Sequence, residues 1–165
     1  MRYSSEKASI KHVPALFRFL EWKKGTKNLD YGAGKYDLTT KYLSSLGVKN
    51  IVYDPYNRTP SENSIALDCY DYDTATLCNI LNVIPHRMER IISIETACMR
   101  VIKGGKIYIC AWVGNNSGNP KISKSNTWQA NKKLESYIDE IKLAFPIYDI
   151  VIKSGKTVKY MEVTI

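Results

Sequence analysis

The segment 28–34, with the sequence Asn-Leu-Asp-Tyr-Gly-Ala-Gly, constrains the fold of this chain more than any other part. A short apolar strand that ends in a Gly-x-Gly turn and leads into a helix is the opening unit of an open α/β sheet. Glycines at such a turn let the backbone bend sharply and let a ligand approach without a Cβ in the way. A ligand is therefore expected beyond the carboxyl end of this strand. The predicted pocket residues are Asp30, Tyr31, Gly32, Ala33 and Gly34.

Strands and helices alternate along the rest of the chain. Apolar runs predict strands, and apolar positions at helical spacing predict helices. The predicted strands are Lys27–Tyr31, Asn50–Tyr53, Ser64–Leu67, Leu77–Val83 and Lys106–Val113, and the predicted helices are Ile10–Trp22, Tyr36–Leu46, Pro85–Ile102 and Thr127–Ala144. Ile147–Ile152 and Thr157–Thr164 surround a polar turn and predict a terminal hairpin. This order predicts an α/β fold, a Rossmann-like three-layer sandwich whose sheet is parallel except for an antiparallel C-terminal hairpin.

The composition fits one domain over residues 1–165. Hydrophobic residues make up 44% of the chain, and no apolar stretch is long enough to cross a bilayer. The N-terminus carries no recognisable secretory signal, so we expect a cytoplasmic protein. The four cysteines form no C-x-x-C pair, and with only two histidines beside them they predict no metal site.

The net charge is +8 and the pI is near 9.2. Such a balance favours an anionic partner, either nucleic acid or an acidic small molecule. The lysines are scattered along the sequence, however, and can equally serve to keep the surface soluble. The charge alone therefore leaves both explanations open.

Two positions indicate which kind of ligand the Gly-x-Gly turn holds. A dinucleotide site requires Gly-x-Gly-x-x-Gly, and Asp37 stands where the third glycine belongs, which argues against a pyrophosphate. Asp30, two residues before the first glycine, suits a cationic ligand such as S-adenosylmethionine, which carries an amino group and a sulfonium. A plain strand-to-helix turn is the alternative, because Gly-x-Gly alone is a weak signal.

Carboxylates follow the next two predicted strands. Asp54 and Pro55 end the second strand, where a carboxylate can accept both ribose hydroxyls of an adenosine. An Asp-Pro pair that starts a turn is the alternative. Asp68 and Cys69 follow the third predicted strand, and we expect them near the adenine edge unless they belong to a solvated loop.

Polar residues at the end of the fourth predicted strand are candidates for the reaction itself. Asn82 is expected to face the reactive end of the cofactor or, alternatively, to cap the following helix. His86 can act as a base if it lies near the pocket, and is otherwise an exposed residue at a helix start. Trp128 and Gln129 follow a long polar loop and form either a lid over the acceptor or, for Trp128, part of the core.

Together these motifs resemble the class I S-adenosylmethionine-dependent methyltransferases. Residues 29–34 are similar to motif I of that family, residues 53–55 to its acidic second motif, and residues 102–107 to the turn before its fifth strand. A narrower resemblance rests on Asp-Tyr-Gly-x-Gly, Tyr-Asp-Pro, and residues 82–87 and 126–138. It points to the methyltransferase-like proteins associated with DNA phosphorothioation genes and to small phage methyltransferase-like proteins.

The resemblance implies an S-adenosylmethionine cofactor and in-line displacement at its methyl group. Asp30 and the turn would hold the methionine part, Asp54 the ribose, and Asn82 and His86 would face the acceptor. Two departures matter. Tyr36 stands where motif I often has a further glycine, and residues 82–85 lack the Asp/Asn-Pro-Pro-aromatic motif of the amino-methylating DNA enzymes.

We therefore expect a methyltransferase that acts on nucleic acid ahead of a small metabolite. One alternative is a non-catalytic S-adenosylmethionine-binding or protein-interaction module, for example a phage protein that acts on host defence. A second alternative is an enzyme that cleaves S-adenosylmethionine without an acceptor. Each alternative is compatible with the same cofactor pocket.

Overall fold

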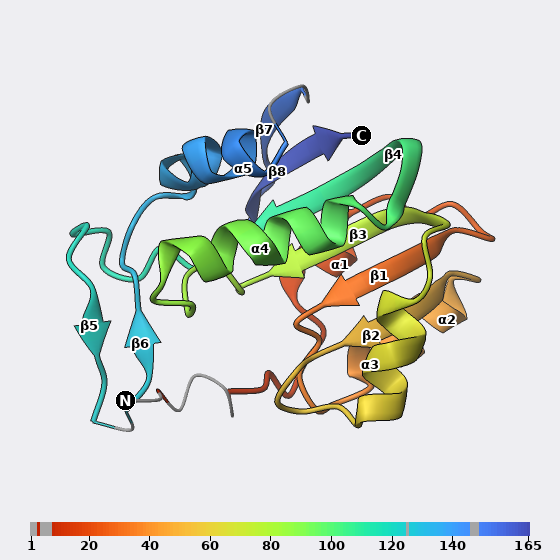
Figure 1. The fold of residues 1–165 in the computed structure, drawn as a ribbon, viewed down its shortest axis with the longest axis horizontal. Coiled ribbons are helices and arrows are strands. Elements are labelled where there is room, and N and C mark those ends of the chain that lie inside the picture. Colours follow the sequence, from red (N-terminus) through yellow and green to blue (C-terminus); the bar gives the residue numbers. More distant parts are fainter. Residues whose placement is uncertain (1–2, 4–7, 125, 146–148) are drawn as a thin grey trace.

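The computed structural model describes residues 3, 8–124, 126–145 and 149–165, and six strands form its main sheet (Figure 1). They are β1 (Lys27–Tyr31), β2 (Lys49–Tyr53), β3 (Tyr72–Cys78), β4 (Val101–Cys110), β7 (Ile150–Ser154) and β8 (Lys159–Thr164). Their spatial order is β2-β1-β3-β4-β8-β7. Strands β1 to β4 are parallel, and β8 runs antiparallel to both β4 and β7. The sheet therefore confirms the predicted α/β class with its antiparallel C-terminal hairpin.

Helices cover both faces of this sheet. They are α1 (Ala15–Phe19), α2 (Leu38–Ser45), α3 (Pro60–Leu67), α4 (Arg87–Cys98), α5 (Ile138–Ala144) and the short 3-10 helix η2 (Leu134–Tyr137). Buried residues of α3, α4 and α5 share one core cluster, whereas those of α1 and α2 belong to two others. Figure 1 shows α4 lying across one face of the sheet, with α1 behind it. The result is the expected three-layer arrangement.

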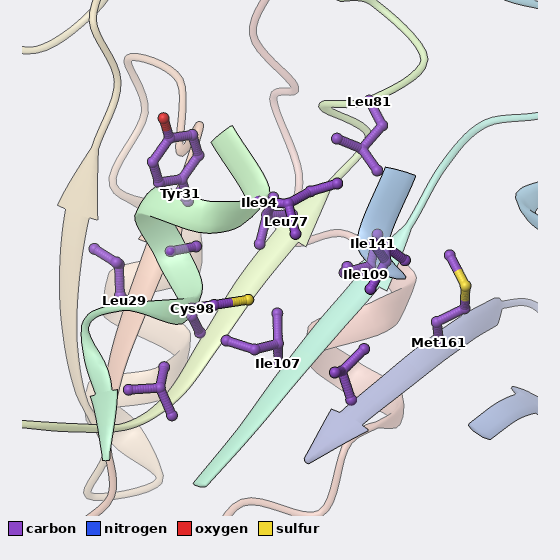
Figure 2. Close-up of a cluster of buried hydrophobic side chains, with 14 of the residues drawn as sticks. Leu29, Tyr31, Leu77, Leu81, Ile94, Cys98, Ile107, Ile109, Ile141 and Met161 are labelled. Atoms are coloured by element: carbon purple, nitrogen blue, oxygen red, sulfur yellow. The ribbon is translucent and has the colours of Figure 1, made fainter. Parts of the chain in front are cut away.

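The larger core lies between the sheet and α4 (Figure 2). Leu77 of β3 and Ile107 and Ile109 of β4 are fully buried there beside Ile94 of α4. Only part of each strand is apolar, since β3 also carries Asp73, Thr74 and Thr76, and the fully buried residues of β4 lie in its second half. Burial of about ten such side chains, each contributing roughly 1.5–3 kcal/mol, fixes the sheet edge that carries the candidate site.

Two of the predicted strands were wrong. Residues Ser64–Leu67 belong to α3, because Thr59 and Glu62 form a reciprocal capping box at the helix start and Pro60 occupies its first turn. Strand β3 begins at Tyr72 and ends at Cys78, earlier than the predicted Leu77–Val83, because Asn79 adopts a φ of 59° and turns the chain out of the sheet.

Three of the predicted helices were too long. The first is limited to α1, and Trp22 folds back so that its indole N–H donates to the carbonyl of Phe17 at 2.8 Å. The third ends at Cys98, because Val101 already pairs with Tyr72 as part of β4. Residues 127–133 precede η2 and include the short strand β6 (Trp128–Gln129), which pairs with β5 (Lys121–Ile122).

The remaining predictions were close. Helix Tyr36–Leu46 corresponds to α2, and the first two strands correspond to β1 and β2. The predicted hairpin corresponds to β7 and β8, although Ile147 itself lies outside the described residues. Errors therefore concentrate at element ends, such as the start of β4 at Val101 instead of Lys106, and in residues 60–85 and 127–133.

Candidate functional site

The Gly-x-Gly turn lies at the carboxyl end of β1, as predicted. Gly32 and Gly34 have φ values of 83° and 69°, which side chains with a Cβ rarely adopt. The N–H groups of Gly32 and Ala33 donate to the carbonyl of Tyr53 at 2.7 and 3.1 Å. The turn is thereby tied to the end of β2, so that the ends of the two parallel strands form one surface.

Asp30 lies directly beneath this turn and is 4% exposed. Burial raises its pKa to about 7, and the side chains of Asn50 and Thr76 and the charge of Arg58 offset only part of that effect. Thr76 Oγ1 lies 3.4 Å from Asp30 Oδ1. No ion pair reaches this carboxylate among the residues that the structure describes. A cationic ligand group beside Asp30 would therefore stabilise its ionised form.

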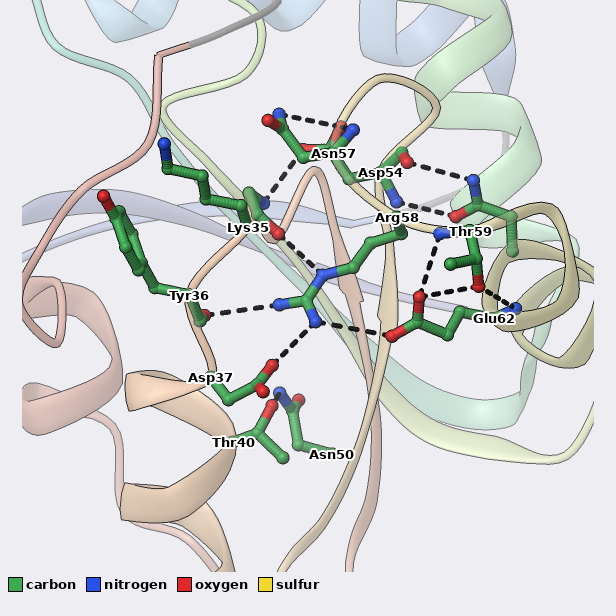
Figure 3. A network of polar contacts seen from close by, with 12 residues as sticks. Lys35, Tyr36, Asp37, Thr40, Asn50, Asp54, Asn57, Arg58, Thr59 and Glu62 are labelled. Carbon is green, nitrogen blue, oxygen red and sulfur yellow. Dashed lines mark hydrogen bonds and ion pairs between the residues drawn. The ribbon is translucent and has the colours of Figure 1, made fainter.

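Asp54 organises the loop that follows β2 (Figure 3). Its Oδ2 accepts the Gly34 N–H at 2.9 Å, and its Oδ1 accepts the N–H groups of Tyr56 and Asn57 at 3.0 and 2.9 Å. The side-chain amide of Asn57 donates to the same Oδ1 at 3.2 Å. Most of the acceptor capacity of Asp54 is used within the protein, and one further site at Oδ2 remains for a ligand hydroxyl.

Arg58 is a residue of the site that sequence reasoning missed. Its side chain is 7% exposed, and its Nε donates to the carbonyl of Gly34 at 2.7 Å. The same guanidinium pairs with Asp37 at 2.7 Å and donates to the carbonyl of Tyr36 at 3.3 Å (Figure 3). Arg58 therefore fixes the turn from the side of α3. No local pattern around position 58 signals this role, because the contact joins segments 24 residues apart.

Two side chains from other segments cover the turn. A Cβ added to Gly32 would overlap Cδ1 of Ile80, and one added to Gly34 would lie 2.9 Å from Oγ of Ser9. The hydroxyl of Ser9 also accepts the N–H of Lys35 at 3.2 Å. The side of the turn toward which a Cβ would project is thus packed by Ile80 and Ser9.

Asn82 is placed near this edge but is held by protein contacts. It is 3% exposed, its Nδ2 donates to Gln129 Oε1 at 3.0 Å, and its carbonyl accepts the N–H of Ala130 at 2.9 Å. Its Oδ1 has no hydrogen-bond partner among the described residues. The residue at the cap position of α4 is His86, so Asn82 does not cap that helix. Asn82 instead joins the loop after β3 to β6.

The other candidate residues differ in how far they are exposed to solvent. Tyr31 is buried and its ring lies 4.6 Å from that of Tyr53, whereas Pro55 and His86 are exposed. Trp128 is 9% exposed, so it is buried as the core alternative requires, but it lies in β6 and not in the last helix as that alternative had it.

The structure corrects the adenine contacts predicted for Asp68 and Cys69. They follow helix α3 and precede β3, so they lie at the amino edge of the sheet, where Lys27 Nζ is 2.7 Å from the Cys69 Sγ.

A cavity of about 600 Å³ opens at the neighbouring strand ends. Its wall includes Cys78 and Asn79 after β3 and Cys110 to Val113 after β4, together with residues of α1, η2 and the β7–β8 turn. Such a volume falls in the range of small-molecule sites. The carboxyl edge thus presents a packed turn over β1 and β2 and an open cavity over β3 and β4.

No protein-family model and no curated protein matches the sequence. The fold, in contrast, is that of solved S-adenosylmethionine-dependent methyltransferases. A methyltransferase from Methanosarcina mazei superposes with a TM-score of 0.63 at 12% identity, over 93% of this chain and 97% of that one. One from Mesorhizobium loti gives 0.61 at 11% identity, over 91% and 94%.

Longer proteins share the fold as well. The 1,6-didemethyltoxoflavin-N1-methyltransferase of Burkholderia thailandensis, solved with its substrate and S-adenosylhomocysteine, gives a TM-score of 0.60 at 13% identity, over 86% of this chain and 70% of that one. TnmH gives 0.64 at 13% identity, and the chain spans 52% of its length. At identities this low, the superpositions show the fold alone, which is a mixed α/β fold of the Rossmann-like methyltransferase type. None of the described helices is long and apolar enough to span a membrane.

Proposed function

We propose that this chain binds S-adenosylmethionine over the Asp30–Gly34 turn and transfers its methyl group to an acceptor. The observation that carries the proposal is Asp30, a buried carboxylate without an ion-pair partner among the described residues, directly beneath a left-handed glycine turn. Its position at the carboxyl edge is where open α/β sheets bind ligands. Asp30 would pair there with the positively charged amino group of the cofactor.

The residues at this edge fit the chemistry of such a cofactor. Asp30 would hold its ammonium group, the backbone of Gly32 to Gly34 its methionine part, and the remaining acceptor site of Asp54 a ribose hydroxyl. The cofactor, when bound, supplies an electrophilic methyl group on a sulfonium. The chain contributes orientation and exclusion of water, which are the main requirements of an in-line displacement.

Asn82 and His86 remain predictions as residues that face the acceptor. The hydrogen bonds of Asn82 to Gln129 and Ala130 support a positioning role for it, because they hold the loop after β3 in place. His86 is exposed at the start of α4, and its side chain makes no capping hydrogen bond to that helix.

A second candidate function is a domain of this fold that makes no use of the cofactor. Ile80 and Ser9 cover the turn, and Asp54 is largely occupied by loop N–H groups. These contacts favour a turn that serves only folding, which is compatible with a protein-interaction module. The two candidates differ in one measurable property, which is affinity for the cofactor.

Calorimetric titration with S-adenosylmethionine and S-adenosylhomocysteine tests the proposal. We expect binding that strengthens as the pH rises through about 7, because the carboxyl of Asp30 must ionise to pair with the ligand cation. Asp30→Asn should weaken binding at least tenfold and abolish this pH dependence. Asp68→Asn is the matched control, since Asp68 is exposed at the opposite edge and should bind as the wild type does.

Ile80→Ala separates the two candidate functions. Removing the side chain that covers Gly32 should strengthen binding if the wild-type turn has to open for the cofactor. Absence of binding in both the wild type and Ile80→Ala would rule out the cofactor proposal. Transfer of a labelled methyl group to an acceptor then distinguishes an enzyme from a binding protein.

A further inference from the structure

We propose that the cavity of about 600 Å³ at the ends of β3 and β4 binds a small, uncharged heteroaromatic molecule, and that this molecule is the methyl acceptor. The second clause rests on the proposed function, whereas the binding site stands on the cavity alone. The expectation that the acceptor is nucleic acid is thereby replaced.

The wall of the cavity is largely apolar and carries one exposed aromatic ring. Leu16, Ala111 and Val158 contribute apolar surface, and the thiols of Cys78 and Cys110, 3.2 Å apart, add polarisable sulfur. Trp112 also lines the cavity and is 67% exposed. Sulfur and indole are both favourable neighbours for an aromatic ring. A planar apolar ligand is therefore the class that this wall fits.

Two amide side chains supply hydrogen-bonding groups in the same cavity. Asn79 and Asn116 line it, and neither side chain has a hydrogen-bond partner among the described residues. Both hold left-handed backbone conformations, with φ values of 59° and 56°, and strained positions of this kind cluster at ligand sites. Because an amide offers a donor and an acceptor side by side, it matches the ring nitrogen and substituent edge of a heterocycle.

The charges around the cavity argue against a phosphate-rich ligand. The charged residues of its wall are Lys133, Glu135 and Lys159, and Glu135 forms an ion pair with Lys159. One cation, Lys133, is left without an ion pair among the described residues. Binding of nucleic acid draws on many phosphate contacts, each made by a separate basic group. The +8 charge of the chain is therefore not concentrated here.

One short loop connects the cavity to the proposed cofactor turn. Cys78 and Asn79 line the cavity, and the next residue, Ile80, covers Gly32. A movement of this loop that uncovers the turn therefore also reshapes the cavity wall. The two subsites adjoin at Ile80, as a donor site and an acceptor site for methyl transfer must. In the transfer, the lone pair of an unprotonated ring nitrogen would form the new N–C bond as the S–C bond of the sulfonium breaks. The positive charge would pass to the methylated ring, and neutral S-adenosylhomocysteine would leave.

Quinoline in its neutral form is the probe for this proposal, measured by protein-observed NMR titration. A ligand of that size reaches a Kd of about 1 mM, so titration to about 10 mM is sufficient. We expect Trp112→Ala to weaken binding about three- to tenfold through loss of stacking. Asn79→Gly should weaken it about fivefold, since glycine keeps the left-handed backbone and removes only the amide.

Tyr70→Ala and Asn126→Gly are the matched controls. Tyr70 is an aromatic residue exposed at the amino edge, and Asn126 holds a φ of 58° outside the cavity wall. Both controls should bind quinoline as the wild type does. Absence of quinoline binding to the wild type would overturn the proposal. Wild-type affinity in both Trp112→Ala and Asn79→Gly would overturn it as well. Tighter binding of AMP than of quinoline at the same residues would overturn it in favour of a nucleotide.

Titration with S-adenosylhomocysteine separates this inference from the proposed function. If quinoline binds as expected and S-adenosylhomocysteine does not, the cavity site stands and the cofactor proposal fails. If S-adenosylhomocysteine binds and quinoline does not, only the acceptor class fails. Trp112→Ala should leave the affinity for S-adenosylhomocysteine unchanged, because Trp112 lines the cavity and not the turn.

Discussion

The two halves of the carboxyl edge of the sheet differ in how they are filled. Over β1 and β2, Arg58 is buried against the carbonyl of Gly34, and Ile80 packs on Gly32. Over β3 and β4, a cavity of about 600 Å³ remains, with Trp112 67% exposed beside it. Parallel strands bring both regions to one edge, and only the residues that follow each strand make them different.

This difference suggests that the half over β1 and β2 stabilises the fold and that the half over β3 and β4 binds a ligand. Close packing and satisfied hydrogen bonds stabilise the fold, whereas open apolar surface contributes little to stability and remains available for a ligand. Substitutions in the packed half should therefore lower the free energy of unfolding. Substitutions in the open half should change ligand binding and leave stability almost unaltered.

Gly32→Ala should have the largest effect. The new Cβ would be held at a φ of 83° and would overlap Ile80. Backbone strain of about 1–2 kcal/mol and overpacking of about 1–3 kcal/mol together predict a loss of roughly 2–5 kcal/mol in the free energy of unfolding. Urea denaturation measures this loss.

Gly25→Ala separates the two causes. Gly25 has a φ of 89°, but a Cβ there would meet no atom within 4 Å, so only the strain remains. The double variant Gly32→Ala/Ile80→Ala should recover the part due to overlap. Equal losses in Gly32→Ala and Gly25→Ala would mean that Ile80 does not pack on the turn.

Asp30→Asn should have the next largest effect, and it depends on pH. Burial raises the pKa of Asp30 from 3.8 in the unfolded chain to about 7, so the folded protein favours the protonated carboxyl. Its contribution to stability is fully present below about pH 4 and is lost as the pH rises through about 7. At 1.36 kcal/mol per pKa unit, the loss is at most about 4 kcal/mol.

The asparagine variant does not titrate, so its stability relative to the wild type should increase between pH 4 and pH 8. Thermal or urea unfolding at several pH values measures the difference between the two proteins. Parallel stability curves would show that Asp30 ionises as freely in the folded protein as in the unfolded chain.

Arg58→Met tests how much the hydrogen bonds and the ion pair of Arg58 stabilise the packed half. The substitution keeps much of the apolar stem and removes the hydrogen bonds to the carbonyls of Gly34 and Tyr36 and the ion pair with Asp37. Loss of bonds from a buried charged group predicts a destabilisation of about 2 kcal/mol. Arg87→Met, at an exposed arginine that begins α4, should cost less than about 0.5 kcal/mol.

Local features of the site could be predicted from the sequence, and long-range ones could not. The left-handed turn at Gly32 and Gly34 and the hairpin of β7 and β8 depend on neighbouring residues, and both predictions were confirmed. The contacts of Arg58 and Ile80 with the turn join distant segments and depend on how the loops pack. No spacing rule anticipates them.

The prediction for Asp68 and Cys69 failed for a different reason. The capping box of Thr59 and Glu62 lies in the sequence just before residues 64–67, whose apolar character also fits a short strand. A strand over residues 64–67 would end at the carboxyl edge of the sheet. The helix that these residues form instead returns the chain to the amino edge. One wrong element type thus moved two residues to the opposite side of the sheet.

Trp112→Ala should have the smallest effect on stability, and it tests the open half directly. The side chain is 67% exposed, and its indole N–H has no hydrogen-bond partner among the described residues. Truncating a surface side chain of this kind changes the free energy of unfolding by less than about 0.5 kcal/mol. The bond from Gln129 to the backbone carbonyl of residue 112 survives the substitution. A loss above about 2 kcal/mol in urea denaturation would mean that Trp112 packs as a core residue, and the contrast between the two halves would disappear.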